Sequence, residues 1–367
     1  MAGAARQGQG LMTNPAVSAP RHRVVDAAAV QELFQREGWS DGLPVVPPTV
    51  EAVERFISSA ALDPDQVVIE IPEQGRSATV ENIAVNAVAA GCRPEYLAVV
   101  VTAARAMASP AYNLHSTTVS GATAPLVIVS GSAVELLGIN SGYSVFGSGH
   151  VANATIGRAV RLVSQNLCGG VPGVVDKATM GHPGKYSFCI GESERHSPWG
   201  PLHVERGVPA DASSVTVFAG EAPIFARNDW ASTPEPILAT IADAMKVSHL
   251  TGGSFVVVLG PLHARVLHRA GLDRAAIRSA LWELSQRSVA DLKRAGRLAG
   301  DVKDGDGTRN RRAVETPEDI VLVVAGGDLY GYSAVVPPWV GGHESKPVTL
   351  QLGSAELNAC RIILEAR

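Results

Sequence analysis

The sequence predicts an α/β protein with two lobes of mixed sheet and helices, joined by glycine-rich loops. Short apolar runs at 125–130 and 254–259 are typical of buried strands. Amphipathic helical patterns, such as those at 153–167 and 273–286, alternate with these runs, as they do in α/β proteins. The chain has 367 residues, which exceeds the length that one ordinary core usually organises.

The composition is that of a folded protein without an electrostatic reason to bind nucleic acid or membranes. Hydrophobic residues make up 46% of the chain and charged residues 18%, as in globular proteins. The formal net charge of -4 leaves no basic excess for a nucleic-acid or membrane-surface partner. No apolar run reaches the ~20 residues of a membrane span, and no secretory leader is recognisable. We therefore expect a cytoplasmic protein.

The first lobe is expected to span residues 24–230, after a disordered lead at 1–23 that is rich in Gly, Ala, Ser and Pro. Asp26 and Thr49 are predicted to cap the first two helices. Between these helices, the prolines of GWSDGLPVVPPT favour an extended segment. The further elements expected in this lobe are a strand at 67–71, helices at 78–92 and 94–107, a strand at 125–130, helices at 132–137 and 153–167, and strands at 185–190 and 214–219.

The second lobe is expected to span residues 231–367 and to follow a more regular pattern. Its predicted elements are a helix at 235–247, a strand at 254–259, helices at 261–270, 273–286 and 289–297, and a strand at 320–325. The charged segment DVKDGDGTRNRR at 301–312 is predicted to be a solvated loop, because it lacks the calcium-loop pattern that ends in glutamate. The segment GGDLYGYSAVVPPWVGGH at 326–343 is predicted to be a long loop.

The run from Asn140 to Gly207 is the best candidate for a functional segment. It gathers histidines, cysteines and acidic residues among many glycines, around a single predicted helix. Glycine and proline place such side chains on turns and loops, where binding and catalytic groups are most often found. Groups that carry chemistry are therefore expected in this run.

A glycine-rich turn before the helix at 153–167 is a candidate anion site. Gly147, Ser148 and Gly149 precede this helix, and His150 follows them, so backbone N-H groups can face a carboxylate or phosphate there. A plain tight turn is an equal alternative, because neither a dinucleotide fingerprint nor a Walker motif is present. The full set of predicted substrate-binding residues is Asn113, His115, Asn140, Ser141, Ser148, Gly149, His150 and Lys185.

Cys189 is the cysteine with the strongest functional context. The four cysteines are spread without CxxC spacing, so reduced thiols are expected. Cys189 ends an apparent strand in KYSFCIGE, and Glu192 follows in the adjoining glycine-rich turn. A thiolate there acts as a nucleophile or redox group if a neighbouring base or cation lowers its pKa. The equally weighted alternative is a buried cysteine that packs as a small hydrophobe.

His203 and Glu205 in PLHVERG form the most suggestive pair of titratable groups. On an extended segment, their spacing of two residues puts both side chains on one side. They can then act as an acid-base pair, or both can bind a metal with a third ligand from His115, His150 or His182. His150 is the third ligand that we favour if a metal is present. The sequence indicates no particular organic cofactor.

Five parts of the sequence resemble a largely uncharacterised bacterial family. They are GWSDGLPVVPPT, ATVENIAVNAVAAGC, NLHSTT, GINSG with GSGHVANATIGRAVRLV, and PGKYSFCIGE with SPWGPLHVERG. The resemblance is strong from Gly38 to Gly207 and looser beyond. Members of that family are often encoded beside a small thiol or selenol protein with a Sec-Gly-Ser-Cys (UGSC) motif. The resemblance implies an enzyme that acts on a small molecule in redox or sulfur chemistry. It also implies that the small thiol or selenol protein is its partner.

Three hypotheses follow. The first is an enzyme, a lyase or oxidoreductase, that uses the Cys189 thiol with His203, Glu205 and Glu192 on a carboxylate or acyl substrate. The second is a metal-dependent lyase or hydratase with His and Glu ligands. The third is a non-catalytic partner subunit of the thiol or selenol protein. The sequence leaves the oligomeric state open, with a homo-oligomer among the outcomes.

Overall fold

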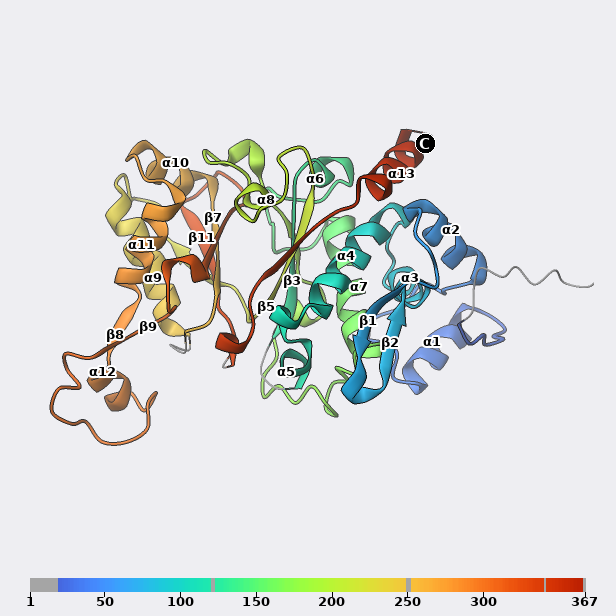
Figure 1. Cartoon of the computed structure of the whole chain (residues 1–367), viewed down its shortest axis with the longest axis horizontal. Helices are drawn as coiled ribbons and strands as arrows, with labels where there is room; N and C mark the ends of the chain where they lie inside the picture. Colours follow the sequence, from blue (N-terminus) through green and yellow to red (C-terminus); the bar gives the residue numbers. More distant parts are fainter. Residues whose placement is uncertain (1–18, 120–122, 249–251, 340, 366–367) are drawn as a thin grey trace, which may run out of the picture.

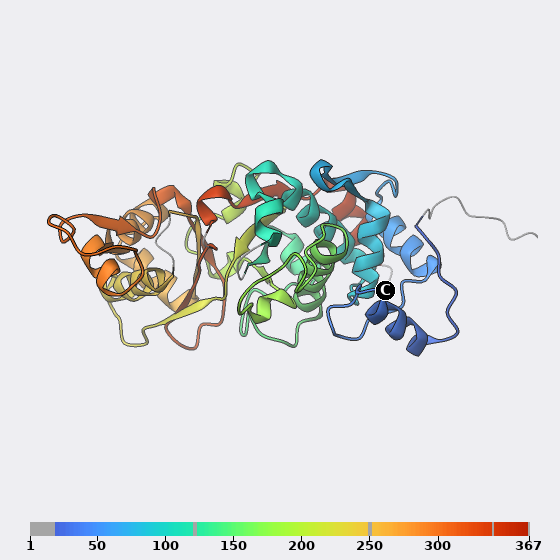
Figure 2. The ribbon, with the colours of Figure 1, turned by 90° about the horizontal axis from the view of Figure 1, so that it is seen from below.

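The computed structural model describes residues 19–119, 123–248, 252–339 and 341–365, and it shows an α/β fold. Within these residues, two four-stranded sheets lie face to face, and helices cover the outer face of each sheet (Figure 1). Helices of residues 234–284 lie at one end of the long axis, and those of residues 27–60 lie at the other (Figures 1 and 2). Residues 1–18 of the expected disordered lead are outside the described ranges.

The two sheets share one plan of strand order and direction. The strands of the first sheet, in spatial order, are β12 (Val348–Gln351), β5 (Ser214–Gly220), β3 (Ala124–Ser130) and β4 (Cys189–Gly191). Those of the second sheet are β6 (Ile224–Arg227), β11 (Tyr332–Val336), β7 (Phe255–Leu259) and β10 (Ile320–Val324). In each sheet the last two strands are parallel, and the other neighbours are antiparallel.

The two sheets exchange an edge strand: in each sheet, the antiparallel strand at the edge is connected along the chain to a strand of the other sheet. Strand β6 follows β5 in the sequence but pairs with β11, and β12 follows β11 but pairs with β5. The two crossing segments meet at an antiparallel bridge between Gly220 and Pro338. The predicted lobe boundary at residue 230 therefore does not divide the two sheets.

The interior between the sheets explains the continuous apolar runs of the central strands. In β3, Leu126 and Ile128 face the second sheet, whereas Val127 and Val129 face the helices. Val256 and Val258 of β7 face the first sheet in the same way. A strand that is covered on both faces needs apolar residues at every position, so it shows no polar alternation.

Helices form the two outer layers. The α-helices are α1 (Ala27–Arg36), α2 (Val50–Ala60), α3 (Val80–Ala89), α4 (Leu97–Ala108), α5 (Leu114–Val119), α6 (Ala133–Leu136), α7 (Val151–Asn166), α8 (Leu202–Glu205), α9 (Pro234–Val247), α10 (Pro261–Arg269), α11 (Arg274–Leu284), α12 (Val289–Arg294) and α13 (Ser354–Glu365). Two small hairpins pair β1 (Val67–Ile71) with β2 (Arg76–Thr79), and β8 (Gln286–Ser288) with β9 (Asn310–Arg312). Among the described residues, no helix is both long and apolar enough to cross a membrane.

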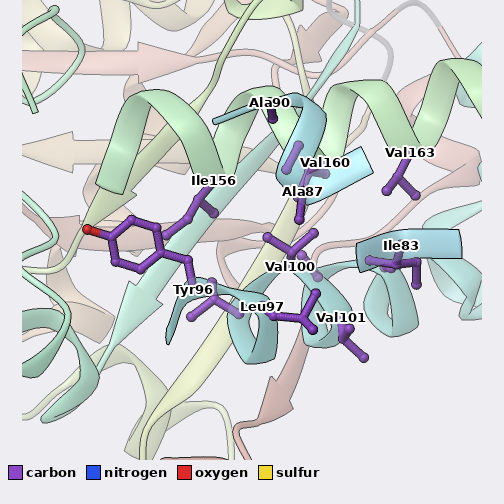
Figure 3. Packing of buried hydrophobic residues seen from close by; sticks show 14 of the residues in the cluster. Ile83, Ala87, Ala90, Tyr96, Leu97, Val100, Val101, Ile156, Val160 and Val163 are labelled. Atoms are coloured by element: carbon purple, nitrogen blue, oxygen red, sulfur yellow. The ribbon is translucent and has the colours of Figure 1, made fainter. Parts of the chain in front are cut away.

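Small apolar side chains let α3, α4 and α7 approach one another closely. Ala87 of α3, Val100 of α4 and Val160 of α7 are buried in one cluster (Figure 3). The alanine- and valine-rich sequence of these helices is therefore a packing requirement, because bulkier residues would force the helices apart. The C-terminal helix α13 returns to this part of the fold, where Cys360 donates to the Glu95 carbonyl oxygen.

The N-caps predicted from the sequence are confirmed. The side chain of Asp26 accepts from the Ala29 N-H, and Thr49 accepts from the Ala52 N-H, so both helices begin where expected. Thr79 forms a reciprocal capping box with Asn82 at the start of α3.

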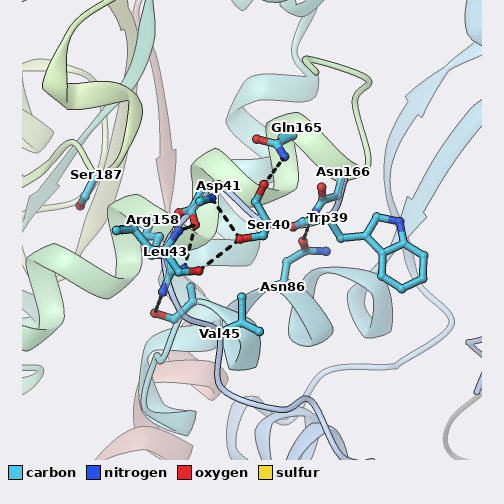
Figure 4. Close-up of polar contacts among 12 residues, drawn as sticks. Trp39, Ser40, Asp41, Leu43, Val45, Asn86, Arg158, Gln165, Asn166 and Ser187 are labelled. Atoms are coloured by element: carbon cyan, nitrogen blue, oxygen red, sulfur yellow. Dashed lines mark hydrogen bonds and ion pairs between the residues drawn. The ribbon is translucent and has the colours of Figure 1, made fainter. Parts of the chain in front are cut away.

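The segment GWSDGLPVV is held on α3 and α7 by a network of polar contacts (Figure 4). Arg158 donates to both carboxylate oxygens of Asp41, at 2.7 and 2.8 Å, and both side chains are largely buried. Gln165 and Asn166, about two turns further along α7 than Arg158, donate to backbone carbonyls of the same segment. The segment thus adds polar anchoring to the apolar contacts that Val45 and Trp39 make with the core.

Three parts of the chain differ from the prediction. The strand expected at 185–190 is shorter, because Pro183–Lys185 forms a 3-10 helix and β4 begins only at Cys189. The loop at 301–312 folds around Asp306, which is fully buried and pairs with Lys293 at 2.8 Å. The loop predicted at 326–343 contains β11, whose residues Ser333 to Val336 are buried.

We expect Asp41→Asn to lower the free energy of unfolding by about 2 to 4 kcal/mol, because it leaves a largely buried guanidinium without its carboxylate. Chemical denaturation followed by circular dichroism measures this change. Glu37→Gln is the matched control, since its partner Arg36 is exposed and the pair should contribute no measurable stability. Equal stability of the two variants would contradict the anchoring role of Asp41.

Candidate functional site

Two carboxylates and one imidazole come together at the C-terminal end of β4. The ligand atoms of Glu192, Glu194 and His203 all lie within 4.8 Å of one another. Glu192 directly follows β4, Glu194 begins a short 3-10 helix, and His203 lies in α8. The cluster combines residues from three consecutive elements, and it forms where parallel strands of the first sheet end, a common place for ligand sites in α/β folds.

The strand geometry directs Glu192 into the space between the sheets. Its N-H donates to the Val129 carbonyl oxygen, so the ladder between β3 and β4 continues one residue past Gly191. Side chains alternate along a strand, and Glu192 therefore follows Ile190, which belongs to the core between the sheets. Both carboxylate oxygens accept from the Leu202 N-H, at 2.9 and 3.0 Å, and this contact fixes the start of α8.

Arg274 supplies the positive charge next to Glu192. Its Nη2 lies 3.4 Å from Oε1 of Glu192, and it also donates to the Gly200 and Leu322 carbonyl oxygens. Burial raises the pKa of Glu192, while the Ser130 hydroxyl, the Leu202 N-H and Arg274 oppose this rise. Arg274 starts α11, which covers the second sheet, so this contact also joins the two sides of the molecule.

His203 is fully buried, and neither of its ring nitrogens has a hydrogen-bond partner among the described residues. The nearest acidic atom is Oε1 of Glu194, 3.7 Å from Nδ1, which is beyond hydrogen-bond distance. That oxygen instead accepts from the Gly131 N-H at 2.6 Å. Buried imidazoles usually have a partner, so this ring is an exception, and together with the two carboxylates it forms a group that could hold a metal ion.

The cluster has one face open to solvent. The side chain of Glu194 is 37% exposed, whereas those of Glu192 and His203 are 0% and 1% exposed. Three protein ligands with one accessible face are typical of catalytic metal sites, which keep a coordination position for water or substrate. Carboxylate oxygens with one imidazole suit divalent ions such as Mn²⁺, Fe²⁺ or Zn²⁺.

Two hydroxyl groups near the cluster add to its unsatisfied polar atoms. Ser130 and Ser214 face each other across β3 and β5. The Ser130 hydroxyl lies close enough to Glu192 to lower the pKa of its carboxyl, but neither serine hydroxyl makes a hydrogen bond of full geometry with the described residues. Both side chains are fully buried. Because they share the inter-sheet face with Glu192, they are suitable for holding water close to the carboxylates.

The structure corrects the predicted pairing of His203 with Glu205. These residues lie in α8, not on an extended segment, and a helix turns residues i and i+2 to different sides. Glu205 pairs instead with Arg274 at 3.3 Å and with Arg278. His150 is the N-cap residue of α7 and is not part of the cluster. The predicted metal set of His203, Glu205 and His150 is therefore not brought together, and the group that could hold a metal ion is Glu192, Glu194 and His203.

The expectation that Cys189 shares a cleft with His203 is wrong. Cys189 lies in the core between the first sheet and its helices, on the face of β4 opposite to Ile190. Burial raises the pKa of its thiol far above the usual range, and the nearby Cys92 adds to the effect. The protonated thiol therefore dominates at physiological pH. Cys189 is best described by the second of its two predicted roles, a buried cysteine that packs as a small hydrophobic residue.

Some of the predicted substrate-binding residues lie near the cluster. Asn140 accepts the Gly191 N-H through its carbonyl oxygen, and Ser141 is in contact distance of the same glycine. Both residues thus flank the strand end that carries Glu192. Ser148 and Gly149 are exposed and precede α7 with His150, whose side chain makes no capping hydrogen bond.

The other predicted residues lie at the opposite end of β3. Asn113 and His115 precede this strand, Lys185 precedes its parallel neighbour β4, and Glu192 follows β4. The seven residues of β3 separate these two ends by roughly 20 Å. Figure 1 shows the same separation, with α5 at one end of the sheet and α8 at the other. The predicted site residues therefore form two groups.

Glu194 and Arg274 are functional candidates that the sequence prediction missed. Glu194 follows Glu192 by two residues, a spacing that could have been noted as a paired-carboxylate pattern. No sequence pattern indicates that Arg274 belongs to the site, because it is 82 positions away from Glu192 and reaches it only through the packing of α11.

The chain matches no model of a known protein family and no curated protein. The resemblance to the bacterial family thus stays an expectation, and the interpretation of the site rests on its geometry.

We expect Cys189 to resist alkylation by iodoacetamide in the native protein at mildly alkaline pH, because its buried thiol does not ionise. Peptide mass spectrometry of native and urea-unfolded samples measures this, with labelling appearing only after unfolding. Rapid labelling of native Cys189 would contradict its assignment to the core.

Proposed function

We propose that the protein is a metal-dependent lyase or hydratase that adds water to, or removes it from, a small acidic substrate. Glu192, Glu194 and His203 would hold a divalent cation. The observation that carries this proposal is the fully buried His203 ring, which lacks a hydrogen-bond partner although two carboxylates lie within 4.8 Å.

The charges around the cluster favour an anionic substrate. Arg274 and Arg278 form ion pairs with Glu192 and Glu205, and Glu194 and Arg206 lie close enough to act on these groups electrostatically. These arginines and glutamates balance in number, so a divalent cation gives the site an excess of positive charge. Such an excess attracts a carboxylate substrate and stabilises negative charge that develops during reaction.

Each protein group has a distinct part in this proposal. A bound divalent cation supplies Lewis acidity and lowers the pKa of a bound water molecule. Arg274 orients the Glu192 carboxylate from outside, as partners of metal ligands commonly do. Glu194 lies at the exposed face, where substrate enters, while Ser130 and Ser214 can hold water on the buried side.

We expect Glu194→Gln to weaken the binding of Mn²⁺ or Zn²⁺ by about 100-fold or more, since changes even outside the ligand shell cost up to that amount. Isothermal titration calorimetry of chelator-treated protein measures the affinity. Glu194 is partly exposed, so the variant should fold. His150→Asn is the control, because it removes a histidine outside the cluster and should leave the affinity unchanged.

The catalytic part of the proposal is tested with metal-loaded protein and a panel of 2-hydroxy and 3-hydroxy acids and their unsaturated counterparts. Proton NMR follows the gain or loss of water. We expect turnover that His203→Asn abolishes and that Cys189→Ala retains, because the thiol lies in the core. Loss of turnover in a folded Cys189→Ala variant would favour thiol chemistry instead, and absence of any metal binding would refute the metal centre.

A further inference from the structure

A second cluster of charges lies at the other end of β3 and β4, away from Glu192. Arg161 on α7 and Lys185 in the 3-10 helix before β4 both contact Asp176. Both cations approach the same oxygen, Oδ2 of Asp176, at 3.1 Å from Arg161 Nη2 and 2.6 Å from Lys185 Nζ. The other carboxylate oxygen accepts from the Ala178 N-H.

These charged groups are unusually well shielded from water. Arg161 is only 6% exposed, and the side chains of Asp176 and Lys185 are 8% and 16% exposed. A buried charge is stable only when it is paired, and the cost of an unpaired one is several kcal/mol. One carboxylate neutralises only one of the two cations, so the cluster carries an excess positive charge.

The neighbouring groups do not remove this excess. Tyr112, which is buried beside Arg161, stays neutral because burial raises its pKa. The Gly170 carbonyl oxygen accepts a second hydrogen bond from Arg161 Nη2, but a neutral carbonyl does not balance the charge of the guanidinium group. Asp41 also acts on Arg161, but it is paired with Arg158 and therefore adds no net negative charge. Burial lowers the pKa of both Arg161 and Lys185, and Asp176 opposes this change in each case.

The loop geometry leaves donors available at the cluster. Among the described residues, Nε and Nη1 of Arg161 donate to no protein acceptor, and the Lys185 ammonium group has three donors but a single carboxylate partner. Gly170 packs against Arg161, where an added Cβ would lie 3.6 Å from Nη1 and 3.1 Å from the Ser164 carbonyl oxygen. The backbone at Gly170 therefore lies close to the guanidinium group.

We propose that Arg161 and Lys185 form a binding site for a small oxyanion, a carboxylate or a phosphate group, at the end of the first sheet opposite to Glu192. The anion would supply the second negative charge that balances the two cations, and its oxygen atoms would accept hydrogen bonds from both of them. Asn113 directly follows Tyr112, which lies beside Arg161, so the segment that carries Asn113 and His115 borders the cluster. The site does not require the metal centre.

Calorimetric titrations of the full chain with inorganic phosphate and with succinate, in the presence of a chelator, test this proposal. We expect saturable binding of at least one of them, and the relative affinities distinguish a phosphate site from a carboxylate site. Lys185→Gln should weaken that binding by about tenfold or more, because it removes half of the buried cation pair. Lys177→Gln is the matched control, since Lys177 is an exposed lysine in the same loop and should leave the affinity within about twofold.

A second variant keeps the test decisive if Lys185→Gln does not fold. Asp176→Asn removes the competing carboxylate, so added phosphate or succinate should raise its melting temperature more than that of the unchanged protein. The absence of saturable binding for both probes, or equal effects of Lys185→Gln and Lys177→Gln, would overturn the proposal. Because the chelator removes divalent ions, these outcomes are independent of those for Glu194→Gln.

Discussion

The apolar contact between the two sheets is the constraint on which the rest of the structure depends. Leu126 and Ile128 on one side and Val256 and Val258 on the other fill one interior, and helices then cover each outer face. Burial of apolar area at this scale is the dominant stabilising contribution in folding. A charged group placed at the end of this interior is therefore stable only if it has a compensating partner.

Glu192 shows how this compensation is achieved. It extends the inter-sheet face of β4 by one residue, so a carboxylate lies where a hydrophobic residue would be expected. The Leu202 N-H and Arg274 satisfy it, and in doing so they bring α8 and α11 to the same point. His203, carried by α8, then reaches the cluster as a direct result of the way Glu192 is satisfied.

The sequence predicted elements whose signal is local. Asp26 and Thr49 cap helices through contacts three residues away, and the buried strands are uninterrupted apolar runs. Strands such as β6 and β12 were not predicted, because they are short, partly exposed and defined by partners far along the chain. The orientation of Glu205 was predicted wrongly for a related reason, since a four-residue helix replaced the assumed extended segment.

The crossing of β6 and β12 restricts how the molecule can move. Each sheet contains a strand whose chain neighbours belong to the other sheet, so the chain passes between the sheets twice. The two crossing segments are bridged at Gly220 and Pro338. The sheets are therefore tied together by two covalent connections as well as by the apolar interior, and any relative movement must be absorbed in these segments. Because of the same crossing, either half produced alone would lack an edge strand and expose a sheet edge prone to self-association.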